Sequence, residues 1–176
     1  MNLKLKRTPG IYIVGFMASG KSTIGRLLAH RLGWSFFDTD TEIESAEKCT
    51  ISEIFAARGE LEFRRIENSI LRQHVAWIER GRPAVLALGG GGFAQSENRE
   101  LIESNGLTVW LDCPFEIVKR RVAAASHRPL ARDPEQFETL YRARLDSYRL
   151  ADVHVPIHGD DPDEVVEAII EHPLFR

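Results

Sequence analysis

The residues with the most specific spacing for chemistry lie near the start of the chain, in the stretch 15–22, which reads GFMASGKS. It fits G-x-x-x-x-G-K-[ST], a loop whose backbone N–H groups can surround a phosphate chain. The glycines of the pattern permit positive φ and let the backbone approach a ligand closely. Lys21 would bring a mobile positive charge to the β- and γ-phosphates, and the Ser22 hydroxyl would ligate magnesium. The pattern therefore predicts binding of nucleotide phosphates.

The segments on both sides of this loop have the character that phosphate binding needs. Residues 11–14 predict a short buried strand, because all four are apolar. Residues 22–32 predict a helix that Gly33 ends, with an apolar face made of Ile24, Leu27, Leu28 and Leu32. The start of a helix adds unpaired N–H donors and the positive end of the helix dipole. A strand, a glycine loop and a helix start would thus hold the phosphates together.

Two carboxylates, Asp38 and Asp40, follow a second predicted strand at 35–37. In open α/β sheets, ligands bind at the carboxyl edge of the strands. Asp38 is a candidate to hold magnesium through water, and Asp40 to orient an acceptor hydroxyl and receive its proton. The alternative is that both are solvated carboxylates near a helix start, where Asp is common.

Arg64 and Arg144 are candidates to bind a carboxylate, because a guanidinium offers planar, two-pronged donors. Arg64 lies in the longest helical pattern, residues 60–80. Its alternative role is an exposed ion pair with Glu60 or Glu67, which would add little to stability. Arg144 could equally pair with a nearby acid, and the sequence leaves both alternatives open.

Two further segments suggest close contact with a ligand. Four glycines, 89–92, follow the predicted buried strand 83–88, where they would weaken the strand but allow close approach to the backbone. Arg128 lies in the polar segment 126–133, next to Pro129. An arginine on such a loop could close over a transferring phosphate and exclude water.

The bulk composition limits the classes of function. The chain has 176 residues, 43% apolar and 28% charged, which predicts one domain spanning 1–176. A net charge of −3 gives no reason to expect a nucleic-acid or membrane-surface binder. Cys49 and Cys113 have no metal-binding spacing, and we expect reduced thiols and a cytoplasmic location. No signal peptide or membrane span is expected.

Predicted strands and helices alternate along the chain. Further strands are expected at 108–111 and 153–157, the latter at an edge because Pro156 cannot donate to a ladder. This order predicts an α/β fold, a three-layer α/β/α sandwich with a five-stranded parallel sheet and right-handed crossovers. Two segments, about 38–80 and about 122–137, are expected to form a substrate-binding segment and a lid on one core.

Taken together, these motifs resemble the shikimate kinase family, within the nucleoside-monophosphate-kinase-like group of P-loop NTP hydrolase folds. The resemblance covers about residues 11–170 and rests on the order and spacing of several motifs. They are the loop 15–23, Asp38-Thr39-Asp40, Glu62-Phe63-Arg64-Arg65, the glycine run, Arg128-Pro129-Leu130 and Arg144 with Tyr148. A phosphate loop alone would not choose among kinases, whereas the set does.

The resemblance implies roles on the acceptor side. Asp40 would bind the shikimate ring hydroxyls and position the attacking one. Arg64 and Arg144 would bind the shikimate carboxylate. Gly90, with Gly89 and Gly91, would let the ligand rest against the backbone. The family often has Arg-x-Pro-x-Tyr where this chain has Asp146 in the place of the proline.

The resemblance also implies which residues bind the nucleotide. Lys21 and Arg128 would neutralise phosphate charge, Ser22 and Asp38 would hold Mg2+, and Arg121 and Pro162 would sandwich the adenine. The residues expected to bind ATP are Ala18, Ser19, Gly20, Lys21, Ser22, Thr23, Arg121, Arg128 and Pro162. Relatives often carry a basic residue at the position that Asp160 occupies here.

The expected function is transfer of the γ-phosphate of ATP to the 3-hydroxyl of shikimate, giving shikimate 3-phosphate and ADP in aromatic amino-acid biosynthesis. Lys21, Asp40 and Arg128 are the expected catalytic residues. Two alternatives stay open: a kinase of another small hydroxy acid such as gluconate, and a nucleotide-binding regulatory domain without turnover. The expected partners are ATP and shikimate, with no nucleic acid or membrane, and the chain is expected to be a monomer.

Overall fold

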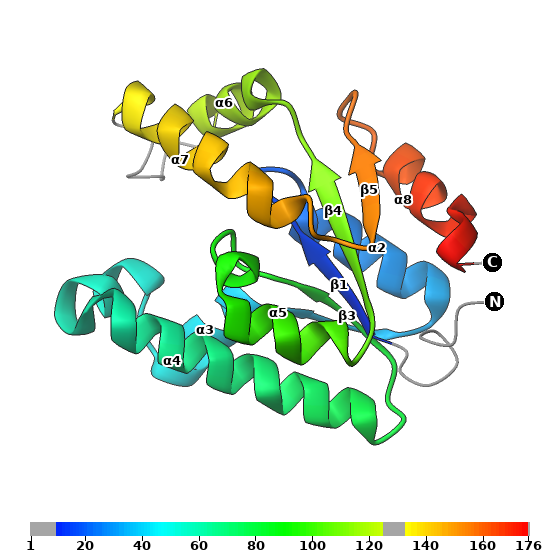
Figure 1. Cartoon of the computed structure of the whole chain (residues 1–176), viewed down its shortest axis with the longest axis horizontal. Coiled ribbons are helices and arrows are strands. Elements are labelled where there is room, and N and C mark those ends of the chain that lie inside the picture. The colour runs from blue at the N-terminus through cyan, green and yellow to red at the C-terminus, as the bar shows by residue number, and fades with distance from the viewer. Residues whose placement is uncertain (1–9, 125–132, 176) are drawn as a thin grey trace.

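A parallel sheet forms the centre of the protein, which a computed structural model describes over residues 10–124 and 133–175. Its strands are β1 (Gly10–Val14), β2 (Ser35–Asp38), β3 (Ala84–Ala87), β4 (Leu107–Asp112) and β5 (Val153–Pro156). They lie in the order β2-β3-β1-β4-β5, and every neighbouring pair is parallel (Figure 1). The five strands predicted from the sequence are therefore confirmed, with β5 at an edge.

Helices cover both faces of this sheet. They are α2 (Lys21–Leu32), α3 (Thr39–Glu47), α4 (Ile51–Glu79), α5 (Ser96–Glu103), α6 (Phe115–Ala124), α7 (Pro134–Tyr148) and α8 (Pro162–Glu171), with short 3₁₀ turns η1 (Gly92–Ala94) and η3 (Pro173–Phe175). Helices α2 and α8 pack together on one face, while α4, α5 and α7 lie on the other (Figure 1). The predicted three-layer α/β/α fold is confirmed.

Local sequence explains where α4 begins and bends. Thr50 and Glu53 form a capping box, in which the Thr50 hydroxyl accepts from the Glu53 N–H and the Glu53 side chain accepts from the Thr50 N–H. Gly59 then takes φ 78° and ψ 174°, which interrupts the helical conformation. The helical pattern predicted at 60–80 is therefore the second part of one element that is kinked at this residue.

The sheet register brings the chemistry-bearing loops to one edge. Ile13 and Asp38 are both in register with Ala87, and Val14 is in register with Trp110. The carboxyl ends of β1, β2 and β3 therefore lie side by side, as expected for ligand binding in an open parallel sheet. The loops that follow these strands are the phosphate loop, the Asp38–Asp40 segment and the glycine run.

Two groups of buried apolar residues hold the fold together. The larger group surrounds the sheet, and all residues of β1 and β3 are buried. A smaller group joins α3 to α4 and consists of Ile43, Ile54, Phe63 and Ile70. Each large aliphatic or aromatic side chain buried in this way contributes about 1.5–3 kcal/mol. The segment that carries Asp40 and Arg64 is thus held by its own contacts as well as by the sheet.

Across the residues described, none of the helices combines the length and the apolar character needed to cross a membrane.

Candidate active site

The phosphate loop adopts a strained conformation that leaves its N–H groups available. Gly15 and Gly20 have φ of 146° and 99°, and Ala18 has φ of 60°, which a residue with a Cβ rarely adopts. A Cβ at Gly15 would lie 2.9 Å from the Leu111 carbonyl oxygen. No side chain caps the start of α2 at Gly20. The first N–H groups of α2 are therefore available to an anion.

Polar side chains gather beside this loop. The Lys21 ammonium donates to the Phe16 carbonyl at 2.9 Å, so it lies across the loop. The Ser22 hydroxyl donates to Asp38 Oδ2. Asp38 Oδ1 accepts from the N–H groups of Asp40 and Thr41, at 3.1 and 3.3 Å, and so caps α3. The sequence assigned the Ser22 hydroxyl and the Asp38 carboxylate to magnesium binding. These contacts hold the two groups next to each other.

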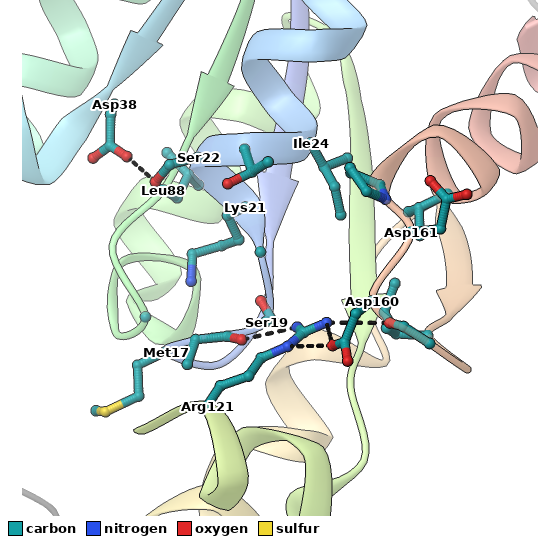
Figure 2. A pocket seen from close by; sticks show the side chains of 18 of the residues that line it. Met17, Ser19, Lys21, Ser22, Ile24, Asp38, Leu88, Arg121, Asp160 and Asp161 are labelled. Atoms are coloured by element: carbon teal, nitrogen blue, oxygen red, sulfur yellow. Dashed lines mark hydrogen bonds and ion pairs between the residues drawn. The ribbon is translucent and has the colours of Figure 1, made fainter. Parts of the chain in front are cut away.

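A cavity of about 500 Å³ extends from the phosphate loop along the carboxyl edge of the sheet. Ser22 and Asp38 line one end of it, and Arg121 and Asp160 line the other (Figure 2). The remaining predicted ATP residues also line it: Ala18, Ser19, Gly20, Lys21, Thr23 and Pro162. Arg128 and part of the predicted lid lie outside the described residues.

The cavity reaches Asp40 and Gly90, where the acceptor side begins. Burial raises the pKa of Asp40 above the ordinary value of an aspartate, and the nearby Lys21 charge opposes that shift. A carboxyl group with a raised pKa at the edge of a phosphate site is suited to proton transfer.

The glycine run makes room for the polar side chains of this site. A Cβ at Gly89 would lie 2.4 Å from Asp40 Oδ1, and one at Gly91 would lie 2.5 Å from Arg64 Nη2. A Cβ at Gly92 would lie 3.0 Å from Glu67 Oε1. At Gly90, by contrast, a Cβ would make only an ordinary contact with the backbone, 3.6 Å from the Met17 nitrogen. Three of the four glycines are therefore required by the site's own carboxylates and guanidinium.

Arg64 is held by two acids of the same helix. Its Nη1 donates to Glu67 Oε2 at 2.8 Å and its Nη2 to Glu60 Oε1 at 3.3 Å. The side chains of Arg64 and Glu67 are only 16% and 3% exposed, so the expectation of an exposed ion pair with Glu67 is wrong. The kink and the packing of α4 turn this face of the helix inward. Arg64 Nε and Glu67 Oε1 are buried without a hydrogen-bond partner in the described residues.

Sequence reasoning named Glu67 only as a possible exposed partner of Arg64 and missed its burial. It lies on the buried stripe of α4 with Phe63, Ile70 and Leu71. Burial raises the pKa of Glu67, and the attraction of Arg64 opposes that shift without cancelling it. The available signal was a carboxylate four residues after Phe63 on an apolar helix face, because acids are rarely buried there without a polar partner.

Helix α7 contributes a further contact to the glycine run. Arg144 Nη1 donates to the Gly91 carbonyl at 3.4 Å, and the Tyr148 hydroxyl donates to the Gly90 carbonyl at 2.5 Å. Asp146, which lies between them, is 89% exposed and pairs with Arg149. Arg144 and Tyr148 therefore reach the same loop without a proline between them.

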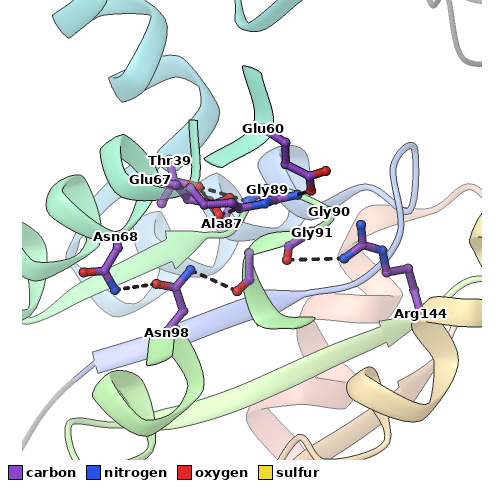
Figure 3. Close-up of polar contacts among 12 residues, drawn as sticks. Thr39, Glu60, Glu67, Asn68, Ala87, Gly89, Gly90, Gly91, Asn98 and Arg144 are labelled. Carbon is purple, nitrogen blue, oxygen red and sulfur yellow. Dashed lines mark hydrogen bonds and ion pairs between the residues drawn. The ribbon is translucent and has the colours of Figure 1, made fainter. Parts of the chain in front are cut away.

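Neutral side chains secure the rest of the loop. Asn98 donates to the Gly92 carbonyl at 3.0 Å and accepts from Asn68 at 2.8 Å (Figure 3). The Thr39 hydroxyl accepts from the Gly89 N–H at 2.9 Å and donates to the Ala87 carbonyl at 3.3 Å. The glycine run is thus tied to α3, α5 and α7 despite its composition.

Taken together, the fold and the phosphate loop define a P-loop protein of the nucleoside-monophosphate-kinase-like type, with a second polar site beside the phosphate loop. Comparison with known proteins identifies the family. Residues 17–173 match the family model described as "Shikimate kinase". The chain belongs to the shikimate kinase family.

Individual relatives agree with this assignment. A shikimate kinase from Caulobacter vibrioides is 45% identical over 168 residues, which cover 93% of this chain and 82% of that protein. One from Persephonella marina is 38% identical over 161 residues, covering 91% of this chain and 96% of the relative. The solved structure of shikimate kinase from Acinetobacter baumannii in complex with shikimate superposes with a TM-score of 0.86 at 34% identity, covering 97% of this chain and 95% of that one.

Proposed function

We propose that this chain transfers the γ-phosphate of ATP to the 3-hydroxyl of shikimate, which yields shikimate 3-phosphate and ADP. Family membership supports the activity and does not favour gluconate phosphorylation or a regulatory domain without turnover. The observation that carries the proposal is the position of Asp40, Arg64 and Arg144 around the glycine run, directly beside the phosphate loop. A hydroxyl-binding carboxylate and two carboxylate-binding guanidinium groups fit a small acid that bears hydroxyls.

Arg64 and Arg144 bind the carboxylate of the acceptor in this proposal. Arg64 Nε is a buried donor without a partner in the described part of the chain, and a carboxylate oxygen would satisfy it. Glu67 holds the Nη1 side of Arg64, so that the opposite side of the guanidinium can meet the ligand. The acceptor rests against the Gly89–Gly91 backbone, whose carbonyls Tyr148 and Arg144 already fix.

Asp40 acts as the general base in this proposal. Its carboxylate accepts the proton of the attacking hydroxyl while the new oxygen–phosphorus bond forms and the bond from the γ-phosphorus to the β–γ bridging oxygen breaks. The burial that raises the pKa of Asp40 makes its carboxylate a stronger base than an exposed aspartate. Such proton transfer contributes typically about 10²–10⁴-fold to the rate. Lys21 and Arg128 meet the charge on the transferring phosphoryl group.

ATP occupies the cavity between the phosphate loop and Pro162 in this proposal. The N–H groups of Gly20 to Thr23, together with Ala18 and Ser19, surround the phosphates, and Arg121 and Pro162 enclose the adenine.

The contact between Ser22 and Asp38 brings together two residues that would hold a magnesium ion, with the Ser22 hydroxyl keeping its proton as a neutral ligand. In ranges 10–124 and 133–175, no group of three or more His, Cys, Asp or Glu side chains could hold a metal. Two protein oxygens are nevertheless a usual set for Mg2+, which otherwise keeps water and substrate phosphates as ligands. Bound magnesium would supply positive charge to the phosphates.

A coupled ADP-release assay with purified protein, ATP and Mg2+ tests the activity. We expect ADP release that depends on shikimate, a much slower reaction with gluconate, and little release without an acceptor. Turnover of gluconate without turnover of shikimate would contradict the proposed acceptor. Tight ATP binding by calorimetry with no phosphate transferred to either acid would support the regulatory alternative instead.

The monomeric state and the cytoplasmic location stay predictions. Sedimentation velocity at micromolar concentration is expected to give one species near the chain mass of 19.9 kDa. A dimer would require a search for residues shared between two chains.

A further inference from the structure

Arg121 lies at the end of the cavity where adenine is proposed to bind. Hydrogen-bond contacts satisfy every edge of its guanidinium group. Its Nη1 donates to the Ala18 carbonyl at 3.1 Å and contacts Cys113 Sγ at 3.7 Å. Its Nη2 donates to the Gly159 carbonyl at 3.1 Å and to Asp160 Oδ1 at 2.8 Å. Its Nε donates to the same Asp160 oxygen at 3.1 Å. These five contacts match the five N–H groups of a guanidinium.

A guanidinium whose edge is satisfied can meet a ligand only with its flat faces. Those faces stack on aromatic rings, whereas the N–H edge binds phosphate oxygens. Arg121 lines the cavity, and its Nη1 lies 3.9 Å from the position of a Cβ on Gly20. An arginine this close to the phosphate loop would bind the triphosphate if its N–H groups were free.

Asp160 is the acid that occupies this edge. Its Oδ1 accepts both Nε and Nη2 of Arg121, while its Oδ2 accepts Nη2 of the neighbouring Arg120 at 2.8 Å. The carboxylate thus joins the loop before α8 to two successive arginines of α6, of which Figure 2 shows Arg121. Hydrogen bonding from Arg121, together with the charges of both arginines, lowers the pKa of Asp160, which therefore stays ionised at neutral pH.

We propose that Asp160 is a positioning residue for the nucleotide: it occupies the N–H edge of Arg121 and so reserves this arginine for stacking on the base rather than for binding phosphate. The inference rests on the proposed binding of ATP and adds a specific source of affinity for the base. Removing the carboxylate frees Nε and one N–H of Nη2, allowing the side chain to turn toward the phosphate loop. The affinity gained from the base would fall, while the affinity for a bare triphosphate would not.

Calorimetry with the full chain and Mg2+ tests this by comparing ATP with inorganic triphosphate, which has no base. In Asp160→Ala we expect the Kd of ATP to rise about five- to twentyfold, the scale of one lost stacking partner. The Kd of triphosphate is expected to stay the same or to fall. In steady-state assays the KM of ATP should rise with its Kd, while kcat and the KM of shikimate change little. The binding arm needs no turnover, so it remains informative if the proposed acceptor is wrong.

Matched variants separate positioning from charge and folding. Asp163→Asn removes an acid from the start of α8 that pairs with Arg31 outside the cavity, and it should leave both Kd values unchanged. Asp160→Glu keeps a carboxylate within reach and should retain most of the ATP affinity. Parallel weakening of ATP and triphosphate in Asp160→Ala, or unchanged ATP binding, would overturn the inference. Thermal unfolding of each variant identifies any loss caused by misfolding.

Discussion

The two ends of the active site are built in different ways. The phosphate end is one continuous stretch, from Gly15 to Thr23, in which the backbone conformation and a helix start leave N–H groups available to an anion. The acceptor end gathers side chains from α3, α4 and α7 around the glycine run, and these segments are far apart in the sequence. It contains two carboxyl groups whose pKa values burial raises, Asp40 and Glu67. A motif thus suffices for the first end, whereas the second depends on packing.

This difference predicts that substitutions at the acceptor end separate catalysis and acceptor binding from nucleotide binding. Substitutions of side chains elsewhere do not remove the backbone N–H donors at the phosphate end. The Arg64 guanidinium at the acceptor end depends on its acidic partners, with contacts of 2.8 Å to Glu67 and 3.3 Å to Glu60. The four predictions below test this separation in order of decreasing effect.

The largest effect is expected for Asp40→Asn. The amide cannot accept the proton of the attacking hydroxyl, so kcat should fall about 10²–10⁴-fold. The Kd of ATP should stay nearly unchanged, because the phosphates are bound mainly by backbone N–H groups. Steady-state kinetics and calorimetry measure the two quantities. Asp146→Asn, at an 89% exposed side chain, is the matched control. If kcat barely changes in Asp40→Asn, Asp40 is not at the acceptor.

The next effect is expected for Arg64→Ala, which removes a buried partner of the acceptor carboxylate. Binding of shikimate should weaken by about 2–5 kcal/mol, with little change for ATP. Arg65→Ala is a matched control on the same helix, because the Arg65 side chain is 70% exposed and pairs with Glu62, which is itself 42% exposed. Equal affinities for shikimate in the Arg64 variant and the wild type would show that Arg64 does not bind the acceptor.

A smaller effect is expected for alanine substitutions in the glycine run. In Gly91→Ala the new Cβ would overlap Arg64 Nη2, and in Gly90→Ala it would make an ordinary contact. Gly91→Ala should therefore cost about 1–3 kcal/mol in the free energy of unfolding or raise the KM of shikimate correspondingly. Gly90→Ala should leave the unliganded protein as stable as the wild type. Urea unfolding without ligand compares them, and equal stabilities with equal KM values would contradict the packing.

The smallest effect is a change in the pH dependence of stability. The pKa of Glu67 is raised in the folded state, so the folded chain binds more protons than the unfolded chain above the ordinary glutamate pKa of 4.5. Its contribution is fully present below that value and is lost as pH rises through the higher folded-state pKa. Glu67→Gln should remove this decline in the free energy of unfolding.

Glu53 provides a control of opposite sign. Hydrogen bonds from the backbone and side chain of Thr50 lower its pKa, so its contribution to stability is lost as pH falls through the folded-state value. Urea unfolding at several pH values measures the free energy of unfolding of the wild type, of Glu67→Gln and of the control Glu53→Gln. If Glu67→Gln and the wild type show the same dependence between pH 4.5 and neutrality, burial does not raise the pKa of Glu67.

Local signals in the sequence predicted most of the fold. Apolar runs gave five strands, and Gly33 correctly ended α2. These features depend on neighbours within a few residues, which a pattern contains directly. The sequence also named Asp40, Arg64 and Arg144, largely through resemblance to a family, and their roles stay proposals.

The sequence named Glu60 and Glu67 as possible partners of Arg64, but it did not predict that the pair with Glu67 is buried or that the glycines make room for the site's own side chains. Glu67 was treated as a partner in an exposed pair, and the glycines were assigned to the ligand alone. Contacts of this kind join residues about 20 to 50 positions apart, such as Asp40 with Gly89, and no periodicity encodes them. The contacts of Asp160 with two arginines of α6, about 40 positions earlier in the chain, likewise could not be predicted from the sequence.

The sequence by itself determined the phosphate loop, because its function resides in the backbone conformation of eight consecutive residues. It also determined the alternation of strands and helices that places this loop at the edge of a sheet. Only the tertiary structure decided the acceptor end, where the packing of α4 and α7 against the glycine run sets burial, pairing and pKa. The physical reason is that desolvation and hydrogen-bond geometry depend on surroundings in space, which distant segments create together.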